Sequence, residues 1–203
     1  SPTKSKNSNA ASITLGIHSS DPGNDDLAYG HSYISVTDNT TGDVHTYGLW
    51  PDYNPKAGGD NGSESDLRKD IELEVAPDGK LDPTADHNRY YELNEDQEAD
   101  LLENLSEHHE YVGSVYEPEK FIIIPTNNCS SYASDTVDDV VGEDVDADSW
   151  LGFETPKELG ESIESLEEKT PSTAPKWRPK FMMEPMGKDN KPVIKNKKWN
   201  NIA

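Results

Sequence analysis

The pattern of apolar and polar positions predicts β-strands in the first third of the chain. Residues 12–18 alternate between apolar and polar side chains, as in a strand with one buried face. Residues 31–37 and 44–50 are rich in β-branched and aromatic residues and are joined by a short turn-forming segment, which predicts a β-hairpin. Residues 67–75 alternate again and predict one further strand.

Helical periodicity and capping residues predict three helices later in the chain. Asn94 is suited to cap a helix over residues 95–109, whose acidic first turn complements the helix dipole. Residues 129–141 carry small and apolar side chains at helical spacing. Residues 156–168 begin with proline, which is favoured at the first position of a helix.

Composition and charge divide the chain into three regions. Residues 1–11 are small and polar and predict a flexible N-terminus, residues 12–168 form the predicted domain, and residues 169–203 form a basic tail rich in Pro and Lys. The whole chain of 203 residues has 18 basic and 40 acidic residues, a net charge of −22. The tail has 9 basic and 2 acidic residues, so the rest has 9 basic and 38 acidic. We expect the tail either to fold back on the acidic body or to bind an acidic partner.

The same composition excludes several classes of function. A strongly acidic chain lacks the basic stripe that nucleic acid or an anionic lipid surface requires. No apolar run approaches a membrane span, and the N-terminus has no secretion signal of the usual kind. A single cysteine, Cys129, excludes an intramolecular disulfide, and no Cys/His set has the spacing of a zinc site. No metal or organic cofactor is therefore predicted.

Two segments carry candidate chemistry. Cys129 lies in Asn127-Asn128-Cys129-Ser130-Ser131 at the start of a predicted helix, where the helix dipole and unpaired N–H groups favour a thiolate. The alternative is a buried structural cysteine on the core face of that helix. His31 opens a predicted strand after Gly30, where its ring could face the start of a helix. Taken alone, such a histidine is usually structural.

Three motifs together resemble a known family. Gly30-His31-Ser32-Tyr33-Ile34-Ser35-Val36, Tyr47-Gly48-Leu49-Trp50-Pro51-Asp52 and Asn127-Asn128-Cys129-Ser130-Ser131-Tyr132-Ala133 resemble papain-like cysteine hydrolases of the NlpC/P60 superfamily. The order of His before Cys is similar to its circularly permuted branch, which includes the lecithin:retinol acyltransferase-like proteins. The missing leader and acidic body resemble peptidoglycan-cleaving effectors of bacterial type VI secretion.

The resemblance implies a fold, an activity and a setting. The expected fold class is α+β, a permuted papain-like fold in which an antiparallel sheet packs against the helix that carries Cys129. Cys129 would be the nucleophile, and His31 would take its proton and later protonate the leaving amine. The expected activity is that of a cysteine endopeptidase or amidase on stem or cross-bridge peptides of peptidoglycan. Such an effector is secreted without a signal peptide, acts in the periplasm of target bacteria, and has an immunity protein and a secretion-machine carrier as partners.

The resemblance also implies a third polar residue that orients the histidine, and its identity stays open. A turn centred in the hairpin pairs His31 with Trp50 and places His45 about five residues, or ~17 Å, from His31. Asp52 lies closer to the end of that strand, and a carboxylate is a natural partner of an imidazole. Asp52 and His45 are the two main candidates, with His87 behind them.

Two other functions remain open at this point. A lipid acyltransferase or thioesterase of the same superfamily would use the same cysteine chemistry on another substrate. A non-enzymatic acidic binding protein would need Cys129 only as a structural residue, and its thiol would then react slowly with alkylating reagents.

Overall fold

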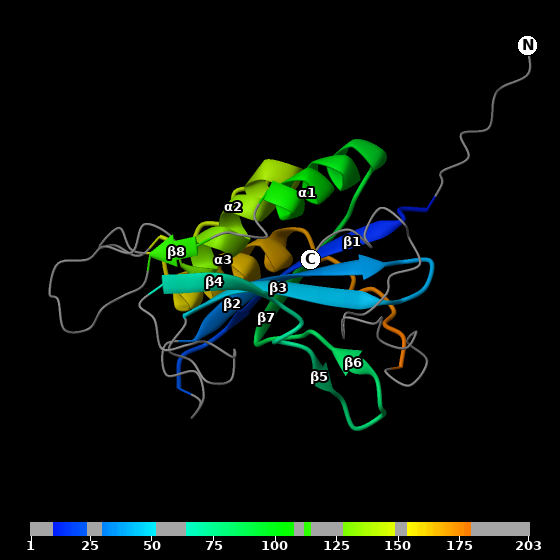
Figure 1. Cartoon of the computed structure of the whole chain (residues 1–203), viewed down its shortest axis with the longest axis horizontal. Helices are drawn as coiled ribbons and strands as arrows, with labels where there is room; N and C mark the ends of the chain where they lie inside the picture. The colour runs from blue at the N-terminus through cyan, green and yellow to red at the C-terminus, as the bar shows by residue number, and fades with distance from the viewer. Residues whose placement is uncertain are drawn as a thin grey trace, which may run out of the picture.

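The chain forms an α+β fold around one antiparallel sheet (Figure 1). The computed structural model describes residues 10–23, 30–51, 64–107, 112–114, 128–148 and 154–179. The N-terminal residues 1–9, residues 52–63 and the tail from residue 180 are among those that lie outside the described residues.

The main sheet has six strands in the order β7-β1-β2-β3-β4-β8, with every neighbouring pair antiparallel. A separate two-stranded ribbon projects from the sheet (Figure 1). The strands of the sheet are β1 (Ile13–Ser20), β2 (His31–Asp38), β3 (Val44–Pro51), β4 (Glu64–Lys69), β7 (His87–Glu92) and β8 (Val112–Ser114), and those of the ribbon are β5 (Glu74–Val75) and β6 (Leu81–Asp82).

The β2–β3 hairpin has the predicted register. Val36 pairs with His45 and Ile34 pairs with Tyr47. The rings of His31 and Trp50, which this register places opposite one another, lie with their centroids 4.0 Å apart. The predicted hairpin and its turn are therefore confirmed. His45 lies on β3 opposite Val36, five residues along β2 from His31.

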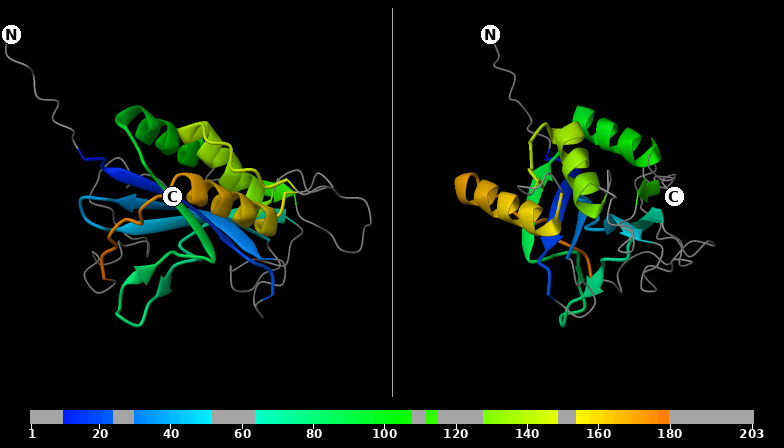
Figure 2. Two further views of the ribbon diagram at one scale, coloured as in Figure 1. Left: turned by 180° about the vertical axis from the view of Figure 1, so that it is seen from behind. Right: turned by 90° about the vertical axis from the view of Figure 1, so that its left-hand side faces the viewer.

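Three helices lie over one face of the sheet, as both views of Figure 2 show. They are α1 (Glu95–Glu107), α2 (Cys129–Val141) and α3 (Pro156–Lys169). α2 packs across β1, β2 and β3, α3 packs across β7 and β1, and α1 packs on α2. Burial of apolar side chains between these layers drives the packing. The core joins residues of all three helices and the central strands: Ile13, Leu15, Ile17, Ile34, Val36, Tyr47, Leu49, Leu101, Leu105, Ala133, Val137, Leu159 and Ile163.

One predicted strand is wrong in its extent. The alternation over residues 67–75 predicts a single strand, but β4 ends at Lys69 and the chain turns at Asp70, whose φ is 63°. Aspartate tolerates this left-handed conformation better than most residues. The turn carries Glu72 back toward β3, and the short strand β5 then begins at Glu74.

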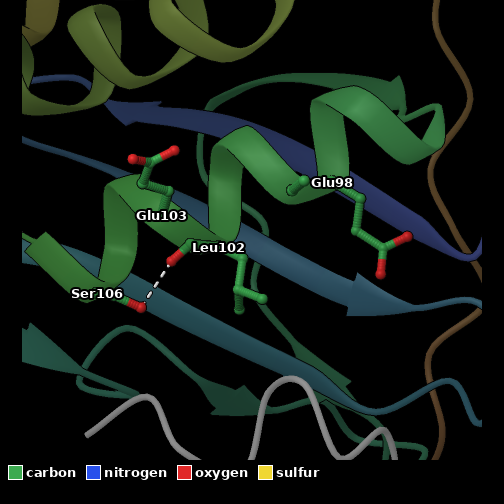
Figure 3. Close-up of a pocket in the computed structure, with 5 residues that line it drawn as sticks. Glu98, Leu102, Glu103 and Ser106 are labelled. Atoms are coloured by element: carbon green, nitrogen blue, oxygen red, sulfur yellow. Dashed lines mark hydrogen bonds between the residues drawn. The ribbon is translucent and has the colours of Figure 1, made fainter.

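Helix α1 follows the N-cap predicted for it. The Oδ1 atom of Asn94 accepts the backbone N–H of Gln97 at 2.9 Å, and the Gln97 side chain accepts the N–H of Asn94 at 3.0 Å. The helix buries Leu101 and Leu105 against the core. Another side of the helix, including Leu102, lines a hollow (Figure 3).

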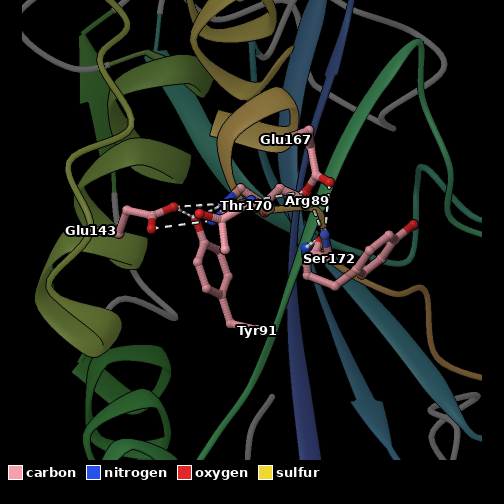
Figure 4. Close-up of polar contacts among 7 residues, drawn as sticks. Arg89, Tyr91, Glu143, Glu167, Thr170 and Ser172 are labelled. Atoms are coloured by element: carbon pink, nitrogen blue, oxygen red, sulfur yellow. Dashed lines mark hydrogen bonds and ion pairs between the residues drawn. The ribbon is translucent and has the colours of Figure 1, made fainter. Parts of the chain in front are cut away.

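An ion-pair cluster around Arg89 ties α3 and the end of α2 to the sheet (Figure 4). Nε of Arg89 donates to Glu143 at 2.6 Å, and Nη1 donates to Glu167 at 3.1 Å. Nη1 also donates to the carbonyl of Thr170 at 2.7 Å. Tyr91 donates to the same Glu143 carboxylate at 2.7 Å. Arg89 is buried, so these bonds satisfy a charge that would otherwise be costly to bury.

The first part of the basic tail folds back on the domain. The indole N–H of Trp177 donates to Oγ1 of Thr37 at 3.1 Å. The backbone N–H of Arg178 donates to the carbonyl of Gly42 at 2.9 Å, and its guanidinium lies 3.5 Å from the buried carboxylate of Asp43. Up to residue 179 the tail therefore takes the first of its two expected arrangements.

Candidate active site

Cys129 is the first residue of α2, and capping bonds fix it there. The Oδ1 atom of Asn128 accepts the backbone N–H groups of Ser130 and Ser131 at 2.9 and 3.0 Å. The N–H of Asn128 donates to Oγ of Ser131 at 2.7 Å, which completes a capping box. The side-chain amide of Asn128 donates to the carbonyl of Glu154 at 2.7 Å. Both ends of the Asn128 side chain therefore hold the start of the helix.

This position makes the thiol acidic. The first turn of α2 has no acidic residue, so the positive end of the helix dipole is not offset there. Burial raises the pKa of Cys129, but the hydrogen bond and charge of His31 outweigh it, with help from the N–H of Ser32 and the hydroxyl of Ser130. The net result is a Cys129 pKa below that of an ordinary thiol.

The fold brings His31 to Cys129, although 98 positions separate them in the sequence. His31 opens β2, and Oγ of Ser32 lies 3.1 Å from Oγ of Ser130, so the start of β2 lies against the start of α2. The imidazole of His31 and the thiol of Cys129 lie close enough for each group to shift the pKa of the other through hydrogen bonding and charge. Burial lowers the pKa of His31, but Cys129 and Glu72 outweigh this effect and raise it to about 9. A low thiol pKa beside a high imidazole pKa favours a thiolate–imidazolium pair.

The carboxylate that holds His31 is Glu72, a residue that the sequence reasoning missed. Nε2 of His31 lies 2.9 Å from Oε1 of Glu72, and only 4 % of the Glu72 side chain is exposed. Because Nε2 faces the carboxylate, Nδ1 is the nitrogen left for the thiol. Oε1 also accepts the indole N–H of Trp50 at 2.8 Å, and Oε2 accepts the hydroxyl of Thr46 at 2.7 Å. These donors fix the buried carboxylate in one orientation.

Two residues of β3 shape the space around this pair. The indole of Trp50 lies against the imidazole of His31 and is itself buried, so it shields the His31–Glu72 bond from water. Gly48 has no side chain, and a Cβ built there would lie 1.9 Å from Oε1 of Glu72. The absence of a side chain at position 48 therefore makes room for the carboxylate.

The residues predicted to orient His31 are placed elsewhere or not described. Nδ1 of His45 lies 2.9 Å from the carboxylate of Asp70, so His45 does not fill this role, and the hairpin register is the reason. Nε2 of His87 lies 3.0 Å from Asp21, and its Nδ1 lies 3.3 Å from Glu164. Asp52 lies outside the described residues.

A chain of buried hydroxyl groups leads away from the thiol. Oγ of Ser130 lies 3.9 Å from Sγ of Cys129 and 3.1 Å from Oγ of Ser32. Oγ of Ser32 lies 2.9 Å from Oγ of Ser19, which donates to the carbonyl of Pro156 at 2.5 Å. Since that last bond uses the only proton of Ser19, Ser32 donates to Ser19. The hydroxyl of Ser130 is then free to donate to Ser32 or to a thiolate at Cys129.

Other features of the described residues lie apart from this site. The hollow in Figure 3 is lined by five residues of α1 and includes neither Cys129 nor His31. No group of three or more His, Cys, Asp or Glu side chains in the described ranges is arranged to hold a metal ion. No helix in the part of the chain that the structure describes is long and apolar enough to cross a membrane.

Comparison of the chain with protein-family models, with curated proteins and with solved structures finds no match. The similarity to the NlpC/P60 superfamily therefore rests on the three sequence motifs. The chemistry of the site depends on the contacts of Cys129, His31 and Glu72.

Proposed function

We propose that the protein is a cysteine hydrolase that cleaves amide bonds. The single observation that carries this proposal is the buried contact of the Cys129 thiol with His31, whose other ring nitrogen is held by Glu72. A structural cysteine has no need of an imidazole partner or of a carboxylate to orient that partner. A nucleophile, a base and an orienting group in this order form the arrangement of a catalytic triad.

In the first half of the reaction the thiolate of Cys129 attacks the carbonyl carbon of the amide. The carbonyl π electrons move to oxygen. The N–H groups of Ser130 and Ser131 are already bound to Asn128, so the backbone N–H of Cys129 is the group at the start of α2 that we assign to the oxyanion. The imidazolium of His31 gives its proton to the amide nitrogen as the carbon–nitrogen bond breaks. The amine leaves, and a thioester joins the acyl group to Cys129.

In the second half, neutral His31 takes a proton from water, and the resulting hydroxide attacks the thioester carbon. The carbon–sulfur bond breaks, the acid product leaves, and the Cys129 thiolate and His31 imidazolium are restored. Glu72 touches no reacting atom and acts as a positioning residue, because it holds the ring of His31 and stabilises its protonated form.

We place the substrate in the peptides of the bacterial cell wall. Three features support a permuted papain-like fold: His31 precedes Cys129, the histidine opens a strand of an antiparallel sheet, and the cysteine begins the helix packed on that sheet. The motif resemblance then points to a stem or cross-bridge amide of peptidoglycan. Action in the periplasm of target bacteria, with an immunity protein and a secretion-machine carrier as partners, belongs to the same proposal.

The test is digestion of purified peptidoglycan followed by mass spectrometry of the soluble products. The wild-type protein should release fragments with a new amine and a new carboxylate, and Cys129→Ala and His31→Ala should release none. Cys129→Ser is the matched control for shape, since it keeps a hydroxyl in place of the thiol. Equal products from the wild type and Cys129→Ala would remove the proposal.

Two further assays distinguish this proposal from the two rival functions. An acyltransferase would move an acyl group from lipid vesicles and leave the wall intact. A non-enzymatic binding protein would show slow alkylation of Cys129 in the folded state, whereas the low pKa of this thiol supports fast alkylation.

A further inference from the structure

The turn that carries Glu72 has an unusual backbone. Asp70 follows the end of β4 and has a φ of 63°, the one positive φ at a residue other than glycine among the described residues. Such conformations persist where the surrounding contacts hold them, and they concentrate at functional sites. Here the turn reverses the chain so that Glu72, two residues later, reaches back over β3 to His31.

Two adjacent residues of β3 hold both ends of this turn. The N–H of Asp70 donates to the carbonyl of Thr46 at 2.9 Å, and the N–H of Thr46 donates to Oδ1 of Asp70 at 3.0 Å. The hydroxyl of Thr46 donates to Oε2 of Glu72 at 2.7 Å. Nδ1 of His45 lies 2.9 and 3.1 Å from the two oxygens of Asp70. Strand β3 therefore binds two carboxylates, that of Asp70 at the reversal and that of Glu72 after it.

The His45–Asp70 contact is buried on the histidine side. The ring of His45 is 1 % exposed, and its Nε2 has no hydrogen-bond partner in the described part of the chain. Its Nδ1 faces a carboxylate, so Nδ1 carries the proton and donates it. The fold leaves one ring nitrogen unsatisfied while it keeps the other on Asp70. This arrangement gives His45 a role other than the one predicted from the sequence.

We propose that Asp70 and His45 are positioning residues that set Glu72 against His31. This inference rests on the proposed function, because it takes the contact of Cys129, His31 and Glu72 as the catalytic arrangement. Asp70 supplies a left-handed turn and a carboxylate that binds the N–H of Thr46 and the ring of His45 on β3. Without these contacts, Glu72 samples other orientations. His31 then loses part of its stabilisation as an imidazolium, and the Cys129 thiol becomes less acidic.

The experiment measures the rate at which iodoacetamide alkylates Cys129 as a function of pH. The chain has one cysteine, so the signal belongs to this site. Asp70→Ala removes both the tolerance of the turn and the carboxylate, Asp70→Gly removes the carboxylate alone, and Asp70→Asn keeps the turn and one acceptor oxygen. Asp78→Ala is the matched control, because Asp78 is exposed in the β5–β6 turn.

The expected order of thiol pKa is Asp70→Ala highest, then Asp70→Gly, with Asp70→Asn and Asp78→Ala near the wild type. A rise of one unit lowers the thiolate fraction about tenfold at pH values below the pKa, and we expect Asp70→Ala to approach this size. His45→Asn should stay near the wild type, since its amide nitrogen can replace Nδ1, whereas His45→Ala should resemble Asp70→Gly.

A double-mutant cycle with Glu72→Gln separates positioning from general stability. If Asp70 acts through Glu72, Asp70→Ala should add no further shift in the Glu72→Gln background. Additive shifts, or a lower melting temperature with an unchanged alkylation profile, would overturn the inference. If Glu72→Gln alone leaves the profile unchanged, the proposed catalytic arrangement fails, and the inference fails with it.

Discussion

Replacement of Gly48 by alanine would place one methyl group in the contact between Glu72 and His31. A Cβ at position 48 would lie 1.9 Å from Oε1 of Glu72 and 3.0 Å from Nε2 of His31. Non-bonded heavy atoms pack at about 3.5–4.0 Å, so the carboxylate must move by more than about 1 Å. The bond of 2.9 Å between Glu72 and His31 would then be lost, although no functional group has been removed.

The size of the effect follows from the type of bond. A hydrogen bond to a charged group contributes roughly 1.5–3 kcal/mol, and each 1.4 kcal/mol is about tenfold in rate or equilibrium. We therefore expect the kcat/KM for amide hydrolysis to fall roughly 10- to 100-fold in Gly48→Ala. Overpacking of this kind also lowers the free energy of unfolding by about 1–3 kcal/mol, so thermal unfolding must be measured alongside.

The controls isolate the clash with Glu72. Gly79→Ala introduces a methyl group into open space in the β5–β6 turn at a left-handed φ of 82°, so it strains the backbone away from the site and should leave the rate of hydrolysis of the folded protein unchanged. Glu72→Ala removes the group that the methyl would strike, so Glu72→Ala with Gly48→Ala should be no slower than Glu72→Ala alone. A folded Gly48→Ala protein with the wild-type rate would refute the reasoning.

Three further predictions follow from the charged groups. The rate of hydrolysis should rise as the pH increases through the lowered pKa of Cys129. It should fall as the pH increases through the His31 pKa of about 9, because a neutral imidazole cannot protonate the leaving amine. A rate that still rises above pH 9 would contradict the role of His31 as the acid. Burial lowers the pKa of His18 to about 4, so only the unfolded chain takes up its proton between about pH 6.5 and 4. In urea unfolding, the free energy of unfolding of the wild type should therefore fall by on the order of 3 kcal/mol between about pH 6.5 and 4, and that of His18→Gln should not. The same dependence of this free energy on pH in both proteins would contradict the prediction. Arg89→Met should lower the free energy of unfolding by on the order of 2 kcal/mol with unchanged Cys129 alkylation, and an unchanged melting temperature would count against the role of the cluster.

Local sequence signals predicted the parts of the fold that local chemistry determines. The helical spacing that begins at Cys129 predicted α2 with its observed start, and the structure adds the cap at Asn128 that fixes this start. The turn residues between β2 and β3 predicted the pairing of Val36 with His45. These elements depend on contacts between residues that are close in the sequence, so the local sequence is enough to predict them.

The third residue of the site depends on contacts that local patterns do not encode. Glu72 lies between Ile71 and Leu73 in an alternating stretch, where a charged residue is expected to face solvent. The reversal at Asp70 turns it inward instead, and the donors that stabilise it come from β2 and β3. The only local signal was Asp70 itself, a residue type that tolerates the left-handed conformation.

The strand β7 was also missed, because its residues are mostly polar. Arg89 is buried there only because carboxylates from α3 and from the end of α2 surround it. Such a residue is normally expected on the surface, and long-range ion pairs overturn that expectation. The register of the hairpin was predicted correctly, yet the partner of His45 was not, since Asp70 belongs to a turn that the alternation concealed.

The central claim is that Cys129 carries a thiolate because His31 carries the proton. The most direct measurement is the ultraviolet absorbance of the thiolate, titrated in the wild type and corrected with Cys129→Ser as the blank. The thiolate signal should appear at a lower pH than in an ordinary thiol and should move up toward the ordinary thiol pKa of about 8.5 in His31→Ala. A wild-type thiol that ionises only at that ordinary value, with no response to the loss of His31, would contradict the account.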